Sequence, residues 1–215
     1  MSAPGGPEGA GGAGDAADVR EPALAGPVGP DDHAQGPPHA PVTLVVYGDY
    51  ECPFTRRART VVRAAQQRAG DRLRYVFRNF PLAKHPHAFR AAEAAEGAAA
   101  QGKFWEMYEL LFRTHWALEE DDLVGYATLL GLDLDRFRDD LARHAHAPRI
   151  RTDLESGERS GVRGTPTFFV NGTRYEDLED SVDALLGVID RAAAHAGAPS
   201  ATQSAGSGPG SEPSQ

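Results

Sequence analysis

Cysteine is almost absent from this chain, because Cys52 is the only one among 215 residues. A single cysteine excludes an intramolecular disulfide, and with it a small scaffold held together by disulfides. Cys52 lies in the stretch YGDYECPFT, residues 47–55, where a proline follows it at once. A lone thiol in such a place is either a small buried apolar side chain, the commonest role of free cysteine, or a reactive group.

Long apolar runs and basic patches are absent as well. No stretch reaches the roughly 18 apolar residues that cross a bilayer, so we expect no membrane partner. The first residues have neither the basic nor the apolar segment of a secretory signal, which predicts a cytoplasmic protein. The net charge is −9, with Lys84 and Lys103 as the only lysines, and this argues against nucleic acid as a partner.

Aromatic residues are missing from both ends of the chain. Residues 1–30 and 196–215 consist mainly of Gly, Ala, Pro and Ser. Such segments cannot bury enough apolar surface to offset the entropy lost on ordering the backbone. We therefore predict two disordered tails and a single folded domain over residues 31–195, long enough to form one hydrophobic core.

What the middle of the chain does contain is an alternation of strand and helix patterns. The apolar, β-branched run at 42–48 predicts a strand buried on both faces. After Pro53 the period becomes helical and ends at Gly70. A second strand is predicted over 73–80. The apolar face of the predicted helix consists of Ala58, Val61, Val62, Ala65 and Ala69.

A helical block of about residues 85–156 follows the second strand, and the chain then returns to strands. TPTFFVNGTRY, residues 165–175, predicts a hairpin that turns at Asn171-Gly172. An amphipathic helix over 176–194 ends the pattern. The order strand, helix, strand, helical block, strand, strand, helix predicts an α/β fold with a mixed sheet covered by helices.

This order, with Cys-Pro at the start of the first helix, resembles the thioredoxin fold with the helical insertion of its DsbA-like branch. APVTLVVYGDYECPFT, residues 40–55, resembles the first strand and active-site turn of that branch, whose motif usually runs D-[FY]-x-C-P-x-C. GKFWEMYELLF at 102–112 resembles a stretch of its helical insert, and GVRGTPTFFVNG at 161–172 resembles its cis-proline loop and hairpin. DDHAQGP at 31–37 is similar to the usual lead-in.

On these motifs, the chain also resembles the thioredoxin-like domain fused to some Na⁺/H⁺ antiporters, which often carries C-P-[YF]-T. Because the sequence contains no membrane-spanning run, we expect a free-standing relative. The transport function of the antiporters is not part of this expectation.

The resemblance implies that Cys52 is the catalytic nucleophile and that Thr55 occupies the position of the second cysteine. A helix N-terminus favours the thiolate, and the Thr55 hydroxyl is predicted to donate a hydrogen bond to it. Threonine cannot attack a mixed disulfide, because oxygen does not take part in thiol–disulfide exchange. The alternative interpretation is that Thr55 is simply a helix residue tolerated after the site lost its function.

Four further residues are predicted to bind the substrate. Pro53 sets the start of the helix, and Phe54 offers an apolar contact but no positive charge, so we expect poor oxidising power. Thr165 and Pro166 correspond to the cis-proline loop, where the Thr165 backbone would pair with an extended partner segment. Without the resemblance, Pro166 is an ordinary proline at the start of a strand.

Two histidine pairs, His85 with His87 and His144 with His146, have the side chains of metal ligands. Neither pair has cysteines or carboxylates at the spacing of a metal site. We therefore predict solvent-facing histidines at helix ends and no metal.

The leading hypothesis is a DsbA-like thiol–disulfide oxidoreductase with one active cysteine. It forms mixed disulfides with protein thiols or disulfides, and glutathione or another low-molecular-weight thiol acts as co-substrate and resolves them; no bound cofactor is expected. One alternative is an enzyme of the glutathione-S-transferase or isomerase type on the same fold. Another is a non-catalytic binding domain. Both monomers and dimers occur in the family, so the oligomeric state is left open.

Overall fold

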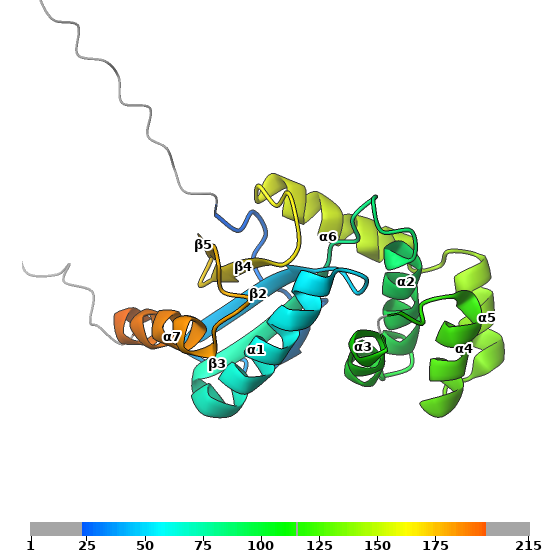
Figure 1. The fold of residues 1–215 in the computed structure, drawn as a ribbon, viewed down its shortest axis with the longest axis horizontal. Helices are drawn as coiled ribbons and strands as arrows, with labels where there is room; N and C mark the ends of the chain where they lie inside the picture. Colours follow the sequence, from blue (N-terminus) through cyan, green and yellow to red (C-terminus); the bar gives the residue numbers. More distant parts are fainter. Residues whose placement is uncertain (1–22, 115, 197–215) are drawn as a thin grey trace, which may run out of the picture.

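A five-stranded mixed sheet forms the centre of the molecule (Figure 1). The computed structural model describes residues 23–114 and 116–196. The strands are β1 (His33–Gln35), β2 (Val42–Gly48), β3 (Leu73–Asn79), β4 (Thr167–Val170) and β5 (Thr173–Tyr175). Their order in the sheet is β1-β3-β2-β4-β5. Only the central pair, β2 and β3, is parallel, which confirms the mixed sheet.

The helix between the parallel strands has the predicted buried face. α1 (Pro53–Ala69) buries Thr55 together with all five predicted apolar residues. It ends at Gly70, whose φ of 55° lies in the left-handed region that glycine adopts without strain. The short 3₁₀ turn η1 (Gly70–Arg72) then leads into β3. The change of hydrophobic period after Pro53 therefore marks the strand-to-helix junction.

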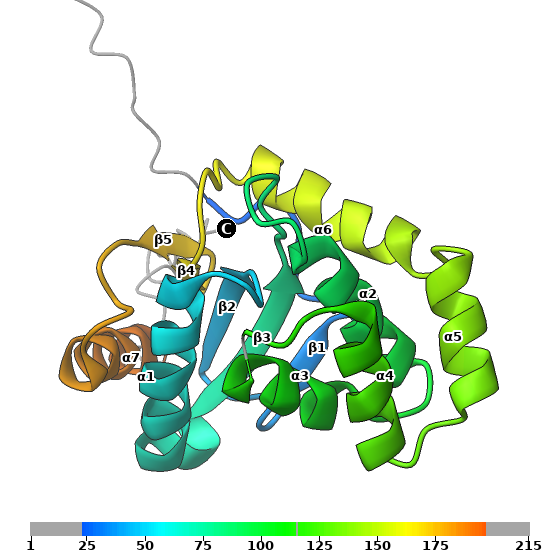
Figure 2. The same cartoon turned by 45° about the vertical axis from the view of Figure 1, so that its right-hand side comes forward.

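In the described part of the chain, five helices lie between β3 and β4, where the helical block of about residues 85–156 is predicted. They are α2 (Ala88–Ala99), α3 (Phe104–Arg113), α4 (Glu120–Leu129), α5 (Leu134–Ala142) and α6 (Ala147–Arg159). α2 packs against each of the other four, and its many alanines allow this close approach. Figure 2 shows α6 running from the helical block back toward the sheet. α7 (Val182–Ala196) packs against α1 instead.

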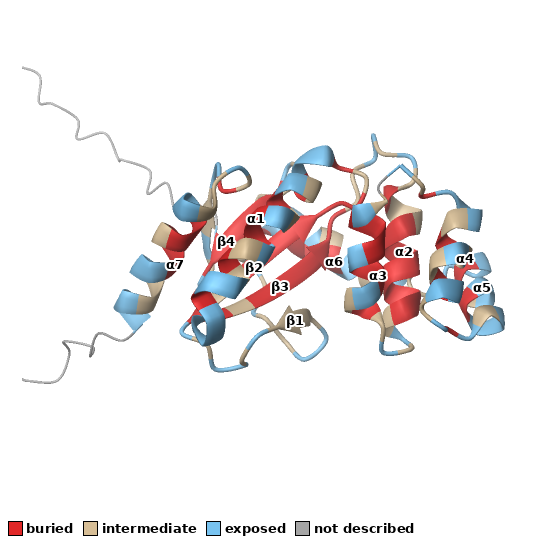
Figure 3. Cartoon of the chain, turned by 60° about the horizontal axis from the view of Figure 1, so that its bottom comes forward, coloured by how far each residue is buried: buried red, intermediate tan, exposed pale blue. Residues whose placement is uncertain are grey.

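The hydrophobic core lies on both faces of the sheet. Along β2, Leu44 and Val46 face the larger cluster beneath α1, α2 and α3, whereas Val45 and Tyr47 face a smaller one with Phe169 of β4. Burial on both faces is why β2 reads as a continuous apolar run rather than an alternating one. Figure 3 shows that the central strands and α2 are the most completely buried elements, while α4 and α5 expose one side. None of the helices in the described part of the chain combines the length and apolar character that a bilayer crossing requires.

The N-terminal edge of the domain differs from the prediction. β1 pairs antiparallel with β3 and has no counterpart in the predicted elements, because three residues carry too short a pattern. Residues 23–30, predicted as part of a tail, pack on the sheet: the Leu24 N–H donates to Gly172 O at 2.9 Å. Within the described residues, the packed part of the chain therefore begins at residue 23 and not at the predicted boundary of residue 31. The rest of the N-terminal tail and residues 197–215 lie outside the described residues.

Candidate active site

Cys52 is the N-cap residue of α1, between the end of β2 and Pro53 at the first helical position. Its backbone is extended, and its carbonyl accepts the N–H of Arg56 at 3.1 Å. The first N–H groups of a helix lack intrahelical partners and form the positive end of the helix dipole. The thiol therefore stands at the end of α1 that favours negative charge.

The cis-proline loop lies against Cys52, although 113 residues separate them in the sequence. The Thr165–Pro166 peptide bond is cis. The Cys52 thiol donates to Thr165 O with an Sγ–O distance of 3.2 Å, and Cys52 is only 3% exposed. Pairing of β4 with β2, with Thr167 opposite Tyr47, brings this loop to the end of β2. Cys52, Thr165 and Pro166 thus form one site.

Thr55 is buried one helical turn after Cys52, but its hydroxyl is used differently from the prediction. It accepts a hydrogen bond from the Asp49 N–H at 3.4 Å. Among the described residues, the structure shows no hydrogen bond between this hydroxyl and Cys52 Sγ. Thr55 therefore ties the start of α1 to the loop that precedes the cysteine.

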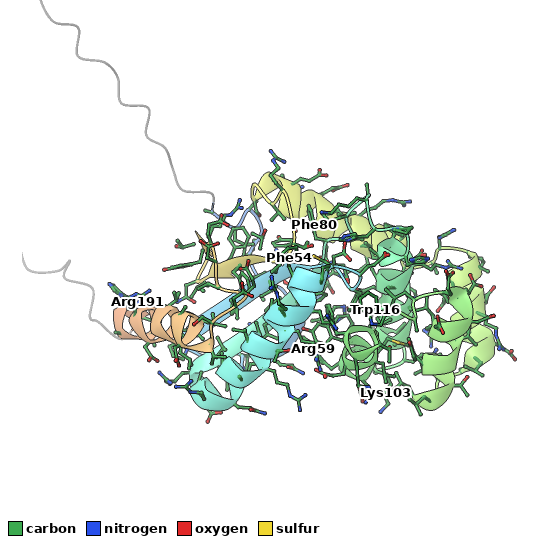
Figure 4. All side chains as sticks on the ribbon, viewed as in Figure 1. Phe54, Arg59, Phe80, Lys103, Trp116 and Arg191 are labelled. Atoms are coloured by element: carbon green, nitrogen blue, oxygen red, sulfur yellow. The ribbon has the colours of Figure 1, made fainter. Side chains whose placement is uncertain are left out.

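Phe54 and Pro53 form the exposed surface beside Cys52. Phe54 is 51% exposed, and the guanidinium of Arg57 lies 4.8 Å from the centre of its ring. Figure 4 shows Phe54 at the N-terminal end of α1. Of the predicted binding residues, these two face solvent, whereas Thr165 is buried and Pro166 half-buried.

The first histidine pair lies beside this site, and the prediction of a solvent-facing side chain is wrong for His85, whereas the side chain of His87 is 37% exposed. The side chain of His85 is only 17% exposed, and its Nδ1 lies 2.7 Å from Asp49 Oδ2. His87 contacts two carboxylates, Glu51 through Nδ1 at 3.2 Å and Glu119 through Nε2 at 3.1 Å. The hydrogen bond that His87 donates to Glu51 raises the pKa of His87 above its usual value, and the charge of Glu119 adds to this.

Of the second histidine pair, His144 is largely exposed and contacts the buried carboxylate of Glu93 at 2.9 Å. His146 is mostly covered and lies 3.3 Å from Asp140. Within the ranges that the structure describes, no three His, Cys, Asp or Glu side chains are grouped closely enough to hold a metal ion.

A pocket of about 330 Å³ lies beside the start of α1, and its lining includes the residues before and after Cys52 but not Cys52 itself, which is 3% exposed. It is lined by Glu51, Pro53, His85, His87, Trp116 and Leu118. The residues come from the β2–α1 loop, the first position of α1, the β3–α2 loop and the α3–α4 connection. Sequence reasoning missed this set, because the acidic residues before Cys52 and the His-Pro-His stretch are joined only by the tertiary fold.

Comparison with known proteins identifies relatives of the whole domain. The sequence model of a family described as thioredoxin matches residues 29–191. The Na⁺/H⁺ antiporter NhaA 1 of Salinispora arenicola is 48% identical over 171 residues, which are 79% of this chain and 26% of the antiporter. NhaA 3 of Salinispora tropica is 51% identical over 154 residues, 71% of this chain and 24% of that protein. The chain thus spans about a quarter of the length of these relatives.

Solved structures share the fold. Oxidised BdbD from Bacillus subtilis superposes with a TM-score of 0.66 at 21% identity, covering 76% of this chain and 93% of BdbD. α-DsbA1 of Wolbachia pipientis superposes with a TM-score of 0.66 at 20% sequence identity, covering 79% of this chain and 94% of α-DsbA1. A thioredoxin-like oxidoreductase from Silicibacter pomeroyi superposes with a TM-score of 0.61 at 28% sequence identity, covering 76% of this chain and 93% of that protein. The chain therefore belongs to the thioredoxin family and has the DsbA-like form of the thioredoxin fold.

Proposed function

We propose that this domain is a thiol–disulfide oxidoreductase with one active cysteine, in which an external low-molecular-weight thiol resolves the mixed disulfide. The observation that carries the proposal is the position of Cys52 Sγ, at the start of α1 and 3.2 Å from Thr165 O in the cis-proline loop. The DsbA-like fold supports thiol–disulfide chemistry in general. Thr55 supports the single-cysteine form, because the chain contains no second thiol.

The reaction consists of two exchanges. The Cys52 thiolate attacks one sulfur of a partner disulfide, so that a Cys52 mixed disulfide forms and the other partner sulfur leaves as a thiolate. In a dithiol enzyme a second cysteine would release the partner. Here glutathione or another low-molecular-weight thiol performs that second attack. A compartment that keeps such thiols reduced is needed, and we propose the cytoplasm.

Partner proteins are bound on both sides of the sulfur. When Cys52 reacts, its hydrogen bond to Thr165 O is given up, and this carbonyl then accepts an N–H of an extended partner segment, as in strand addition. Pro53 and the exposed ring of Phe54 provide the apolar contact on the other side.

The decisive experiment follows the adduct at Cys52. Incubating the protein with oxidised glutathione is expected to add one glutathionyl group, detected by intact-mass spectrometry, and reduced glutathione is expected to remove it. A Cys52→Ser variant should form no adduct and should lose deglutathionylation of a glutathionylated peptide. Thr60→Ala, on the exposed side of α1, is the matched control and should behave as the unmodified protein.

The other outcomes decide between the alternatives. Full activity of Cys52→Ser on a glutathione-dependent reaction would refute the proposal in favour of an enzyme of the glutathione-S-transferase type. A wild-type protein that forms no adduct would instead be a non-catalytic binding domain.

A further inference from the structure

We propose that Asp49 and His85 form an acid–base pair that deprotonates the external thiol as it resolves the Cys52 mixed disulfide. This inference rests on the proposed function and assigns the second exchange to a specific place. It gives a chemical role to the His-Pro-His stretch, which the first exchange does not use.

The carboxylate of Asp49 is held rigidly beneath the site. Asp49 is 1% exposed and lies three residues before Cys52 in the β2–α1 loop. Its Oδ1 accepts the N–H of Glu51 at 2.8 Å, and its Oδ2 accepts the N–H of Leu82 at 2.8 Å. The same Oδ2 lies 2.7 Å from Nδ1 of His85. Three hydrogen-bond partners around one buried carboxylate fix its position.

This contact determines which nitrogen of His85 is available. An ionised carboxylate only accepts hydrogen bonds, so Nδ1 of His85 must carry the proton that it donates. In the neutral imidazole, Nε2 then keeps its lone pair and is a proton acceptor. Among the described residues, the structure gives Nε2 of His85 no hydrogen-bond partner. Asp49 thus orients the ring, while the other nitrogen stays available for a ligand.

The pocket that His85 borders reaches both neighbours of Cys52. Glu51 and Pro53, the residues before and after the cysteine, line it together with His85. Its volume of about 330 Å³ lies at the small end of the range for small-molecule sites. Trp116 and Leu118 provide an apolar wall, and Figure 4 shows Trp116 on the side of the helical block. A low-molecular-weight thiol therefore fits this place.

The charged groups around His85 are compatible with this role. From the β2–α1 loop, Asp49 contacts it and Glu51 lines the same pocket. His87, in the same β3–α2 loop as His85, lines the pocket and is hydrogen-bonded to Glu51. Glu119, at the start of α4, contacts His87. Asp49 therefore contacts the ring that takes the proton, and a second carboxylate, Glu51, lines the same pocket.

The proposed step balances as follows. The thiol R–SH transfers its proton to Nε2 of His85, and the thiolate R–S⁻ attacks the partner sulfur of Cys52–S–S–R′. The R–S–S–R′ bond forms, the bond to Cys52 Sγ breaks, and Cys52 leaves as a thiolate. The external thiol and R′ are thereby joined in the oxidised product, and Cys52 is reduced. His85 afterwards returns its proton to water.

Single-turnover resolution of a preformed glutathionyl adduct tests the inference. With reduced glutathione near neutral pH, His85→Gln is expected to slow the release of the adduct by about a hundredfold, the low end of general acid–base effects. With thionitrobenzoate, which is already ionised at this pH, the same variant should resolve at close to the wild-type rate. A merely structural role of His85 would slow both thiols equally.

Two further variants complete the design. Asp49→Asn is expected to show the same selective loss, because the amide no longer fixes the tautomer of His85. His144→Gln, a histidine paired with a carboxylate away from the site, is the matched control and should resolve both thiols normally. The inference is refuted if His85→Gln resolves the adduct with glutathione at the wild-type rate, or slows both thiols alike. Failure of the adduct to form at all would instead refute the proposed function.

Discussion

Thr55 is the residue that separates this site from a dithiol one. It is buried at the start of α1, and its methyl group approaches Gly48 so closely that a Cβ there would stand 2.8 Å from Thr55 Cγ2. Its hydroxyl is bound to the Asp49 N–H rather than to the sulfur. The residue thus has a packing role and no means of expelling a partner from Cys52.

Replacing Thr55 by cysteine should restore the dithiol reaction. A thiol one helical turn from Cys52 can attack the mixed disulfide, so Thr55→Cys is expected to form a disulfide between Cys52 and the introduced thiol and to release glutathione without external thiol. Thiol counting and intact mass after oxidation measure this directly. Thr55→Ser, which keeps a hydroxyl, should retain the adduct. A Thr55→Cys protein whose adduct persists as in the wild type would contradict the assigned geometry.

The junction between β2 and α1 depends on one glycine. Gly48 ends β2, and its carbonyl accepts the N–H of Phe80 at 2.7 Å. A Cβ at this position would stand 2.3 Å from the ring of Phe77 in β3. Because the loop from Gly48 leads directly to Cys52, close packing of the strands and placement of the sulfur are linked.

A Gly48→Ala variant is therefore expected to be destabilised. Overpacking of a well-filled core costs about 1–3 kcal/mol, which urea unfolding can measure, and the displaced loop should slow adduct formation at Cys52. Gly125→Ala in α4 is the opposite case, because nothing lies within 4 Å of its added Cβ. That variant should be as stable as the wild type or more stable by up to about 1 kcal/mol. Equal stability of the two variants would be evidence against this packing argument.

The helical block is joined to the sheet by a buried polar network. The backbone N–H of Asn79, at the end of β3, donates to Asp153 of α6 at 3.0 Å, and its side chain donates to Glu96 of α2 at 2.7 Å. His33 of β1 contacts Glu96 at 2.9 Å, and Arg149 contacts Asp153 at 2.5 Å. Burial raises the pKa of Asp153 to about 6, although Arg149 and the Asn79 N–H act in the opposite direction.

This raised pKa predicts a pH dependence of whole-molecule stability. In the folded state Asp153 holds its proton up to pH about 6, whereas in the unfolded chain it loses it near pH ~3.9. Between these values the folded state binds more protons, so the contribution of Asp153 to the free energy of unfolding falls as pH rises. The total loss is on the order of 2–3 kcal/mol and is complete above pH about 6.

An Asp153→Asn variant isolates this effect, because it cannot titrate. The unfolding free energy of the wild type minus that of the variant should decrease between pH about 4 and 7, in urea titrations at several pH values. Taking this difference removes the contribution of the other carboxyl groups, such as Asp32. Burial by itself would raise the pKa of Asp32, but the hydrogen bonds from Arg78 and Gly29 outweigh burial, so that the pKa of Asp32 is lowered. A difference that stays constant over this range would disprove the assignment.

Features that depend on residues close together in the sequence were predictable from the sequence alone. The helical spacing from Ala58 to Ala69 and the Asn171-Gly172 turn are confirmed. The position of Cys52 at a helix start followed from Pro53 in the same way. The resemblance placed the 161–172 stretch in the cis-proline loop, and the structure brings this loop to the sulfur.

Features that depend on two distant segments were not predictable from pattern. β1 is too short to carry a period, and residues 23–30 have the composition of a tail yet are held by Gly172 and by the guanidinium of Arg78. His85 looked like a surface histidine, because nothing near it in the sequence indicates a carboxylate partner.

By itself the sequence determined the fold class, the single cysteine at a helix N-terminus and the threonine three residues after it, since these depend on residue type and local spacing. Only the tertiary structure decided what surrounds that sulfur. The parallel pairing of β2 with β3 puts the ends of both strands at one edge of the sheet, so the loops carrying Asp49 and His85 meet there, 36 residues apart in the chain. Hydrogen bonds between such segments leave no periodic trace in the sequence.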